Sequence, residues 1–512
     1  MTESPGFTVV VPTIGRPSLR VLLENLFAQL SASELSAPVI VVDDRTESEG
    51  PLVLPHGRAA TILRTGGRGP AAARNFGWRA ATTEWVVFLD DDVVPTGSWT
   101  ADLIADLAAV PYDAGGSQGR IRVPRPMGPA TRPTDWHRNT AGLERAQWAT
   151  ADMAYRRPAL AAVDGFDESF PRAYREDADL GLRVSVAGSR IVPGRRVVEH
   201  PVRGADRWVS IRSQRGNADD ARMRAKHGGD WRRRAGVPRG RLPLHVITVL
   251  GAFTAIAGAA AGPRHRRPAV IGGAVAIGLT ADLMWRRIAP GPRTRDEIAT
   301  MVLTTPLLAP AAVWHRVKGE VEVRRARRRP EVPARPAPAA LLLDRDGTIV
   351  RDVPYNGDPE LVELLDGVGA SLERVRENGL ALAVVTNQSG VARGMLSIEQ
   401  VDAVNRRIDE LAGPIQHWVV CPHAPDDGCA CRKPASGMVL DAARRLGTTP
   451  EQCVVIGDTG ADVEAATNAG ARAILVPNPV TRAEEIRSAP EIAPTFRDAV
   501  DRVLAPLVSS HR

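Results

Sequence analysis

Three consecutive aspartates, Asp90–Asp92, follow directly on the apolar run Val86–Leu89 in the first part of the chain. The carboxyl end of a buried parallel strand opens on the ligand crevice of an α/β domain, so these carboxylates are expected where a substrate binds. Adjacent carboxylates repel one another unless a cation neutralises them, and hard oxygen ligands suit Mg²⁺ or Mn²⁺. Alone the motif is weak, because many acidic loops after strands are simply solvated.

Further polar groups are expected at the same sheet edge. Asp43 and Asp44 end a second Val/Ile-rich run, and the glycine-rich loop Gly66–Gly77 leads into a helical pattern that includes Arg74 and Asn75. The N–H groups at a helix start, together with a guanidinium group, favour an anionic ligand such as a phosphate.

Two more acids, Glu176 and Asp177, begin another helical pattern, and His200 stands in the segment VVEHP. Acids at a helix start often do no more than complement the helix dipole. The neighbouring motifs make this pair a candidate for chemistry. For His200, a structural or acceptor-side role is as consistent with the sequence as metal ligation.

Together the segments VVVPTIGRP, VVDD, GPAAARN, FLDDD, REDADL and VVEHP resemble the inverting family 2 glycosyltransferases, which have a nucleotide-diphospho-sugar binding domain. The resemblance implies donor binding by Asp43 and Asp44, metal–diphosphate binding by Asp90 and Asp92, general-base action by Asp177, a further metal ligand in His200, and substrate contacts from Arg74, Asn75 and Glu176. Such chemistry needs a cation on the leaving diphosphate and a base near the acceptor, which agrees with these residue types.

A second set of acids stands in the last third of the chain. Asp344 and Asp346 follow the run Leu341–Leu343 and precede a turn glycine. Two carboxylates at this spacing can act on one phosphoryl group, one as nucleophile and one on the proton of the leaving group. Further along, the segment TNQSG begins with Thr386 at a strand end, and a later Val/Ile strand delivers Asp458.

Arg432 and Lys433 add positive charge for a phosphate, and the segments LDRDGT, TNQSGVARG and CPH…CACRKP resemble the haloacid dehalogenase superfamily, in particular its heptose 1,7-bisphosphate phosphatases. The resemblance implies Asp344 as nucleophile, Asp346 as acid/base, phosphoryl binding by Thr386 and Lys433, Mg²⁺ held by Asp344, the backbone carbonyl of Asp346 and Asp458, and substrate contacts from Asn387, Arg393 and Arg432. Thr459 stands where the family commonly has a lysine, a departure that bears on substrate preference. The gaps between the motifs leave no room for a large cap domain.

Between these motifs lies the set Cys421, His423, Cys429 and Cys431. Three thiolates and an imidazole suit tetrahedral Zn²⁺, and four protein ligands without a vacancy indicate a structural site. We expect the zinc to order the loop so that Arg432 and Lys433 face the phosphate. Four cysteines in 512 residues do not form a disulfide framework and favour a reducing compartment.

The elements that must position these residues form two α/β domains. Residues 7–203 alternate Val/Ile-rich runs with helical patterns, and residues 340–505 repeat this rhythm. The expected buried strands are Phe7–Pro12, Pro38–Asp43, Glu84–Asp90, Ala340–Asp344, Leu380–Thr386, Trp418–Cys421 and Cys453–Asp458. The sequence predicts two separate doubly wound, mainly parallel sheets: a glycosyltransferase domain over 1–205 and a phosphatase domain over 340–512. A helical segment over 206–323 and a linker over 324–339 join them.

The middle segment is apolar enough to meet a membrane. Leu244–Gly262 contains no Asp, Glu, Lys or Arg, and it alone reaches the ~20 residues that a bilayer span needs. Pro268–Ala281 is shorter, and Ile298–His315 is broken by two prolines. A spanning hairpin would put the basic turn Pro263–Pro268 on the far side, against the positive-inside tendency, whereas helices that lie in the interface avoid this conflict. A soluble helical subdomain is the alternative.

The formal net charge of +7 belongs to two short stretches. Arg222–Arg241 and Arg316–Arg335 together hold sixteen basic and four acidic side chains, so the rest of the chain is net acidic. A nucleic-acid enzyme would carry its positive charge on a domain face, so a membrane surface is the better partner and no nucleic acid is expected. The start MTESPG lacks a secretory signal, and we expect a cytoplasmic protein at the inner face of the cell membrane.

The leading hypothesis is a bifunctional enzyme. One module transfers a sugar from a nucleotide sugar to a glycan or lipid-linked acceptor, and the other hydrolyses a sugar phosphate through an aspartyl-phosphate. Alternatives are a phosphatase for another small phosphate ester such as histidinol phosphate, and a membrane-docked scaffold in which one module is inactive.

Overall fold

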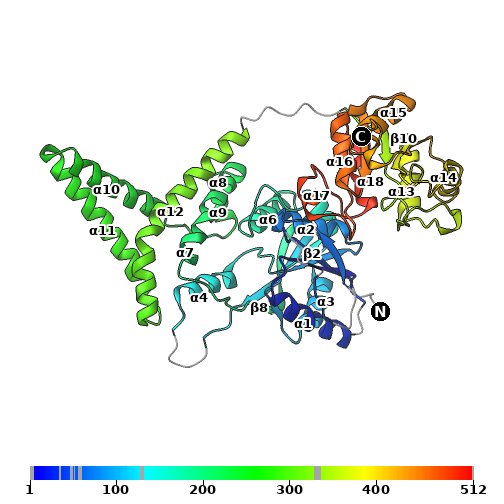
Figure 1. Ribbon diagram of the computed structural model, residues 1–512. Coiled ribbons are helices and arrows are strands. Elements are labelled where there is room, and N and C mark those ends of the chain that lie inside the picture. The colour runs from blue at the N-terminus through cyan, green and yellow to red at the C-terminus, as the bar shows by residue number, and fades with distance from the viewer. Residues whose placement is uncertain are drawn as a thin grey trace.

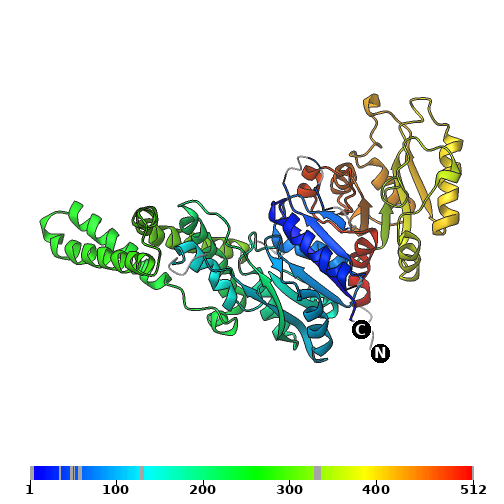
Figure 2. The ribbon, with the colours of Figure 1, turned by 90° about the horizontal axis from the view of Figure 1, so that it is seen from below.

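A computed structural model of the chain describes residues 5–33, 36–46, 50, 52–55, 60–126, 132–327 and 336–509. Two α/β domains, each built on its own sheet, are separated in sequence by a helical arm (Figure 1). From below, the arm extends from one side of the N-terminal domain and the C-terminal domain packs on the other (Figure 2). The expected fold class is confirmed.

The N-terminal sheet has eight strands in the order β3-β2-β1-β4-β7-β6-β8-β5. They are β1 (Phe7–Thr13), β2 (Val39–Asp43), β3 (Thr61–Arg64), β4 (Trp85–Leu89), β5 (Val94–Pro95), β6 (Ala114–Arg122), β7 (Asp152–Arg156) and β8 (Arg190–Glu199). Strands β1 to β4 pair in parallel, and the apolar runs of β1, β2 and β4 are buried, as the sequence predicted. Strand β3 lies at the sheet edge, is partly exposed and was not among the expected strands. Strand β7 is antiparallel to both β4 and β6.

Helices cover both faces of this sheet. They are α1 (Ser18–Ala32), α2 (Pro70–Ala80), α3 (Trp99–Ala109), α4 (Asp135–Thr140), η1 (Ala141–Arg145), α5 (Arg157–Ala161) and α6 (Glu176–Val186). Apolar residues of α1 and α3 pack on one face, and those of α2 and α6 pack on the other. Helices α2 and α6 therefore begin beside the carboxyl ends of β1 and β4, where the acidic motifs lie.

The arm consists of helices only, within the described residues. They are α7 (Val209–Arg212), η2 (Ser213–Arg215), α8 (Gly216–His227), α9 (Trp231–Arg234), α10 (Leu242–Ala260), η3 (Pro263–His265), α11 (Arg266–Ile288) and α12 (Arg295–Arg327). Three of these helices, α10, the η3–α11 segment Pro263–Ile288 and α12, are long and apolar enough to cross a membrane.

The expectation that only one arm segment is long enough to span a membrane is wrong. Helix α11 continues past Asp282, and α12 continues through Pro306 and Pro310. Helix α12 also takes in residues 324–327 of the expected linker, and residues 328–335 of that linker lie outside the described residues.

The C-terminal sheet has five parallel strands in the order β11-β10-β9-β12-β13. They are β9 (Ala340–Leu343), β10 (Ala381–Asn387), β11 (His417–Cys421), β12 (Cys453–Gly457) and β13 (Arg472–Leu475). The surrounding helices are η4 (Pro359–Leu361), α13 (Val368–Glu377), α14 (Ile398–Ala412), η5 (Pro425–Asp427), α15 (Gly437–Arg445), η6 (Pro450–Gln452), α16 (Gly460–Ala469), α17 (Ala483–Ser488) and α18 (Phe496–Ser509). The adjacent strands β9, β10 and β12 all end in the expected motifs.

The two domains touch through α17 and the glycine-rich loop before α2. Gly66 has a φ of +64°, and a Cβ there would lie 2.9 Å from the carbonyl oxygen of Ala483 and 3.2 Å from the Cβ of Ile486. The Arg68 guanidinium donates to the carbonyl oxygen of Ala489 at 3.4 Å, and the Arg487 guanidinium donates to that of Thr46. Only glycine fits this close approach.

Candidate active sites

The aspartates after β4 point in different directions. Asp91 is buried and accepts from the Thr13 hydroxyl at 2.7 Å and from the Arg16 guanidinium at 2.6 Å. It therefore fastens the end of β4 to the end of β1. Asp90, in contrast, accepts from Arg74 at 2.7 Å and is partly open to solvent.

Arg74 lies at the centre of a buried charge cluster. Its guanidinium is 2% exposed and bridges Asp90 and Glu176, the latter at 2.9 Å. Burial lowers the pKa of Arg74, but the two carboxylates outweigh it, so the net shift is upward. Burial and the neighbouring Asp177 raise the pKa of Glu176 to about 8, and burial also raises the pKa of Asp177. A carboxyl pKa raised by burial and a neighbouring charge is typical of catalytic acids and bases.

Asp92 faces the last residues of the domain. Its carboxylate lies 3.0 Å from the Arg203 guanidinium and 3.6 Å from the Nε2 atom of His200. Burial, reinforced by the charge of Asp90, raises its pKa. Among the described residues, the ligand atoms of Asp90, Asp92 and His200 do not all come within 4.8 Å of one another. Their shared role in metal binding stays a prediction.

The acids after β2 hold loops. Asp43 accepts from the Arg45 guanidinium at 2.7 and 2.9 Å. Asp44 accepts from the Thr65 hydroxyl at 2.7 Å and from the Gly69 amide at 3.0 Å, and burial raises its pKa. Asp44 thus shapes the glycine-rich loop, and donor binding by this pair stays a prediction.

The amide of Asn75 is fully engaged inside the protein. Its nitrogen donates to the carbonyl oxygen of Phe166 at 2.8 Å and to Glu168 at 3.0 Å, and its oxygen accepts from the Phe166 amide and the Trp78 indole. The geometry therefore favours a structural role for Asn75 in holding the 166–168 loop. Its expected substrate contact is untested.

In the C-terminal domain the expected residues converge. The Lys433 ammonium group donates to Asp344, to Asp462 at 2.5 Å and to the carbonyl oxygen of Val385 at 2.9 Å. Burial raises the pKa of Asp344 well above its usual range, and the Lys433 charge opposes that shift. The carboxylates of Asp344, Asp458 and Asp462 lie within 4.8 Å of one another and could share a cation.

Asp458 is fixed by hydrogen bonds from the loop that follows β13 and from Thr348 after β9. The Asn478 amide donates to its carboxylate at 2.6 Å, the Thr481 hydroxyl donates to its carbonyl oxygen at 2.8 Å, and the Thr348 hydroxyl donates to its carboxylate at 3.2 Å. Burial, with the nearby Asp462, raises its pKa to about 6. Three acids in one buried place repel one another, so a divalent cation fits the donor set.

Asp346 is turned toward a guanidinium. Arg345, which is buried, donates to both of its oxygens at 3.0–3.1 Å and also to Asn405 at 3.1 Å. The Gln388 amide donates to Asp346 at 2.8 Å and to the Thr386 hydroxyl at 2.9 Å. The side chain of Asp346 thus lies outside the three-acid group, as expected for a residue that offers a metal only its backbone carbonyl.

The expected substrate residues are divided. Asn387 exchanges hydrogen bonds with the backbone of Lys433 at 3.1 and 3.2 Å, so it positions the lysine. Arg432 donates to the carbonyl oxygen of His423 at 3.2 Å. Arg393 is exposed and lies over the ring of Tyr355, whose hydroxyl accepts from it. Substrate contacts by all three stay predictions.

The cysteine loop has the geometry of a tetrahedral metal site. The Cys421 sulfur lies 3.7 Å from the Cys429 sulfur and 3.4 Å from the Cys431 sulfur, and the Nδ1 atom of His423 lies 3.6 and 3.2 Å from the Cys421 and Cys431 sulfurs. A zinc ion about 2.3 Å from each sulfur would separate the ligands by roughly these distances. The donor set therefore fits Zn²⁺.

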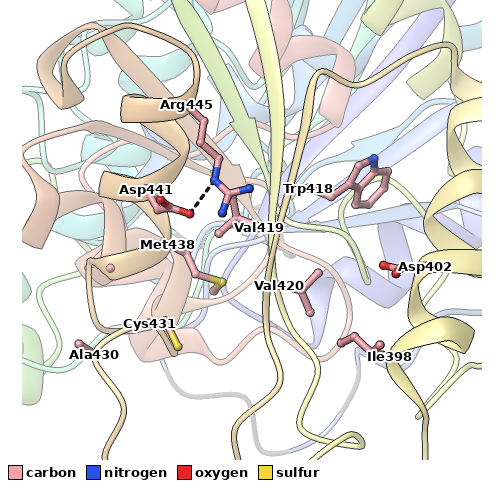
Figure 3. Close-up of a pocket in the computed structure, with 11 residues that line it drawn as sticks. Ile398, Asp402, Trp418, Val419, Val420, Ala430, Cys431, Met438, Asp441 and Arg445 are labelled. Carbon is pink, nitrogen blue, oxygen red and sulfur yellow. Dashed lines mark hydrogen bonds and ion pairs between the residues drawn. The ribbon is translucent and has the colours of Figure 1, made fainter.

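A cavity of about 480 Å³ lies on the outer side of this loop, between α14, the edge strand β11 and α15 (Figure 3). Trp418 and Cys431 line it, and an ion pair of 2.8 Å joins Asp441 to Arg445 at its wall. None of the acids near Lys433 lines this cavity.

Several residues that contact the expected site residues were not predicted from the sequence. Arg345 stands inside the segment LDRDGT, so its position in that motif could have singled it out. Arg16 also belongs to a recognised segment, VVVPTIGRP. Asn478 and Arg203 lie outside any motif, and only the fold brings them to Asp458 and Asp92.

Comparison with known proteins gives two family matches. The model of glycosyl transferase family 2 matches residues 8–168, and that of the HAD-hydrolase-like family matches residues 430–503. The D-glycero-beta-D-manno-heptose-1,7-bisphosphate 7-phosphatase of Pseudomonas putida is 37% identical over 145 residues, which cover 27% of this chain and 81% of the relative.

Two solved structures are also similar. A D,D-heptose 1,7-bisphosphate phosphatase from B. bronchiseptica, complexed with magnesium and phosphate, is 28% identical with a TM-score of 0.30, covering 33% of this chain and 99% of that one. A mannosyltransferase from Pyrobaculum calidifontis, in complex with GDP-Man and Mn²⁺, is 17% identical with a TM-score of 0.34, covering 64% of this chain and 87% of that one.

Proposed function

The C-terminal domain belongs to the haloacid dehalogenase-type heptose-bisphosphate phosphatases and the N-terminal domain to glycosyl transferase family 2, and from this premise we propose specific reactions for both. The chain is an enzyme with a transferase and a phosphatase domain. The phosphatase removes one phosphate from a sugar bisphosphate of the heptose type. The transferase moves a sugar from a nucleotide sugar to a lipid-linked or glycan acceptor.

The convergence of Lys433 and three acids at the end of β9 is the observation that carries the phosphatase proposal. A carboxylate oxygen of Asp344 attacks phosphorus and the bond from phosphorus to the sugar oxygen breaks, while Asp346 supplies the proton to the leaving oxygen. Water then attacks the aspartyl-phosphate, with Asp346 taking its proton, which restores Asp344 and releases phosphate. Lys433 and Thr386 hold the transferring group.

Asp344, Asp458 and the backbone carbonyl of Asp346 would hold Mg²⁺, which would neutralise phosphate charge. Asp462 pairs with Lys433 and keeps its ammonium group beside Asp344. Asn478 and Thr481 fix the orientation of Asp458.

In the transferase, Asp177 removes the proton of the acceptor hydroxyl as that oxygen attacks the anomeric carbon and the sugar–diphosphate bond breaks. Support comes from the upward pKa shift of Asp177 and from its place beside the Arg74–Glu176 pair. A divalent cation on Asp90 and Asp92 would neutralise the leaving diphosphate when bound. The Arg74 guanidinium donates to the Asp90 carboxylate and so fixes its orientation.

A membrane location and a lipid-linked acceptor are supported by the way the arm joins this domain. The buried guanidinium of Arg287, at the end of α11, donates to Asp135 of α4 at 2.8 Å and to Ser210 of α7 at 3.0 Å. The indole of Trp136, next to Asp135, donates to the carbonyl oxygen of Arg203, whose guanidinium contacts Asp92. The apolar helices are thus fixed beside the acid expected to hold the donor.

A phosphate-release screen tests the phosphatase proposal. The full chain with Mg²⁺ is offered heptose 1,7-bisphosphate, other sugar phosphates and histidinol phosphate, and Asp344→Asn serves as the inactive control. We expect release from the heptose bisphosphate at the highest kcat/KM. A higher value for histidinol phosphate would overturn the substrate, and equal release by wild type and Asp344→Asn would overturn the site.

A further inference from the structure

Helix α12 has two unlike faces. One is buried against the protein and consists of Met301, Thr304, Thr305, Leu308, Ala309 and Ala312. The other exposes the large apolar side chains of Val302, Leu303, Leu307, Trp314, Val317 and Val321, which at about 100° per residue fall on one side of the helix. At 1.5 Å per residue this stripe is about 28 Å long. We call these six residues the α12 stripe.

The buried face packs on other helices of the arm. In its first half the Arg287 guanidinium of α11 donates to the hydroxyls of Thr304 and Thr305 at 3.0 and 2.9 Å, and its second half packs on α8. A Cβ on Gly319 would lie 2.6 Å from the Cα of Ala218 in α8, so the two helices touch backbone to backbone. Farther along, the Arg222 guanidinium of α8 pairs with Glu322 at 2.9 Å. These contacts occupy one face of α12 and leave the stripe on the other face exposed.

The hairpin of α10 and α11 projects from the side of α12 opposite the globular domain, and α12 lies between the two in both views (Figures 1 and 2). No residue of α10 is buried, and Phe253 and Ile256 are 68% and 73% exposed. A Cβ on Gly251 would lie 2.7 Å from the carbonyl oxygen of Gly272, the kind of small-residue contact that joins helices in membranes.

We propose that α12 lies flat in the near interface of a bilayer, with its stripe toward the hydrocarbon, while the α10–α11 hairpin crosses the same bilayer. The close contact of Gly251 with Gly272 and the exposed apolar surface of α10 favour a crossing hairpin, although its basic turn Pro263–Pro268 then lies on the far side. This rests on the proposed membrane association and adds which helix crosses and which does not. Helix α10 has 19 residues and α11 has 23. At 1.5 Å per residue both match a hydrocarbon thickness of about 30 Å.

The charges around the α12 stripe fit an anionic lipid surface. Arg293 and Arg295 precede it, and Arg324 and Arg325 follow it. Within its second half, Arg316 and Lys318 pair with Glu320 and Glu322, so the positive charge lies at the two ends of the stripe. Basic side chains beside an apolar helix face are the pattern of helices that lie in a membrane interface. Trp314, 66% exposed on the stripe, has the amphipathic ring that favours this depth. A second copy of the chain on the stripe would bring these arginines close to one another.

The test is site-specific photo-crosslinking in vesicles of phosphatidylcholine and phosphatidylglycerol. The full chain carries a photoreactive amino acid in place of Leu307 or Trp314 on the stripe, Phe253 on the hairpin, or Ala312 on the buried face. We expect lipid adducts from positions 253, 307 and 314, at least tenfold above position 312.

The outcomes of this experiment distinguish the orientation of α12 from membrane association itself. Lipid adducts at 253 with none at 307 and 314 would overturn the orientation of α12 and leave membrane association standing. No lipid adduct at any position would overturn membrane association itself. Adducts between two copies of the chain at 307 and 314 would make the stripe a protein interface and also overturn the proposal.

As a second measurement, Leu303→Glu with Leu307→Glu is compared with Glu360→Gln, a surface change in the C-terminal domain. The double variant should lower the lipid adducts from position 314 at least tenfold, while the adducts from position 253 and the rate of phosphate release stay unchanged. Unchanged adducts from position 314 in that folded double variant would contradict the role of α12.

Discussion

The ammonium group of Lys433 donates to a carboxylate oxygen of Asp344 inside the C-terminal domain, where the lysine side chain is 4% exposed. Two carboxylates, Asp344 and Asp462, depend on this one cation in the protein. The pair is thus a structural unit as well as part of the proposed phosphatase site.

Lys433→Met should abolish phosphate release and also destabilise the domain. Breaking a buried ion pair leaves an uncompensated charge, which costs about 3–5 kcal/mol. Chemical denaturation monitored by circular dichroism measures that loss, and Arg444→Met, on the exposed side of α15, is the control. A variant as stable as the control would contradict the buried pair.

Arg345→Met should lower kcat for phosphate release by about 10- to 100-fold, less than the roughly 10²- to 10⁴-fold contribution of general acid–base catalysis because Asp346 itself remains. The guanidinium holds both oxygens of Asp346, so its loss frees the acid to adopt unproductive positions. KM should change little, because Arg345 is buried away from solvent. Arg351→Met, at an exposed ion pair of the same segment, should behave as wild type in steady-state kinetics.

Gly66→Ala should reduce sugar transfer and leave phosphate release unchanged. The added methyl group would meet the backbone of α17 and would also strain a residue at positive φ, which together cost roughly 1–3 kcal/mol. Gly188→Ala is the matched control, since Gly188 also has a positive φ but a Cβ there meets nothing within 4 Å. Equal effects of the two changes on transfer would show that contact with α17 does not matter.

Much of the core of the fold could be predicted, because the parallel strands are continuous apolar runs that end in acids. Strand β6 could not, since its sequence AGGSQGRIR has neither an apolar run nor a regular alternation. It pairs because β7 and β8 flank it and the Ser117 backbone and hydroxyl accept from the buried Arg196. The full length of α12 could not be predicted either, because Pro306 and Pro310 are typical of helix ends.

The candidate sites, like the fold, could be predicted only in part. Acids that follow strands in sequence were found from spacing alone, and Asp344, Asp458 and Lys433 do come together. Whether a side chain faces a ligand or its own protein depends on loops far away in sequence. Asn75 illustrates this, because the loop at Phe166 and Glu168 occupies its amide.

Glu176→Gln should change how stability depends on pH. The pKa of Glu176 is raised to about 8 in the folded chain, against an ordinary value of 4.5, so its stabilising effect is fully present below pH 4.5 and is lost as pH rises toward 8. The melting temperature of the wild type should therefore fall relative to Glu176→Gln across this window. Thermal unfolding from pH 5 to 9 measures the difference, and the exposed Glu24→Gln should show no such trend.

Zinc removal should uncouple the Cys421–Cys431 loop from the phosphatase site. His423, one of the four expected ligands, accepts from Arg432 through its carbonyl oxygen, and Lys433 follows directly. Loss of the metal should therefore lower both stability and kcat/KM for phosphate release, while Mg²⁺ is kept in excess. Cys429→Ser should reproduce the effect, whereas Cys453→Ser, at a buried thiol outside the loop, should retain zinc. Full activity in protein shown by elemental analysis to contain no zinc would refute the link, because the ion would then not order the segment that carries Lys433.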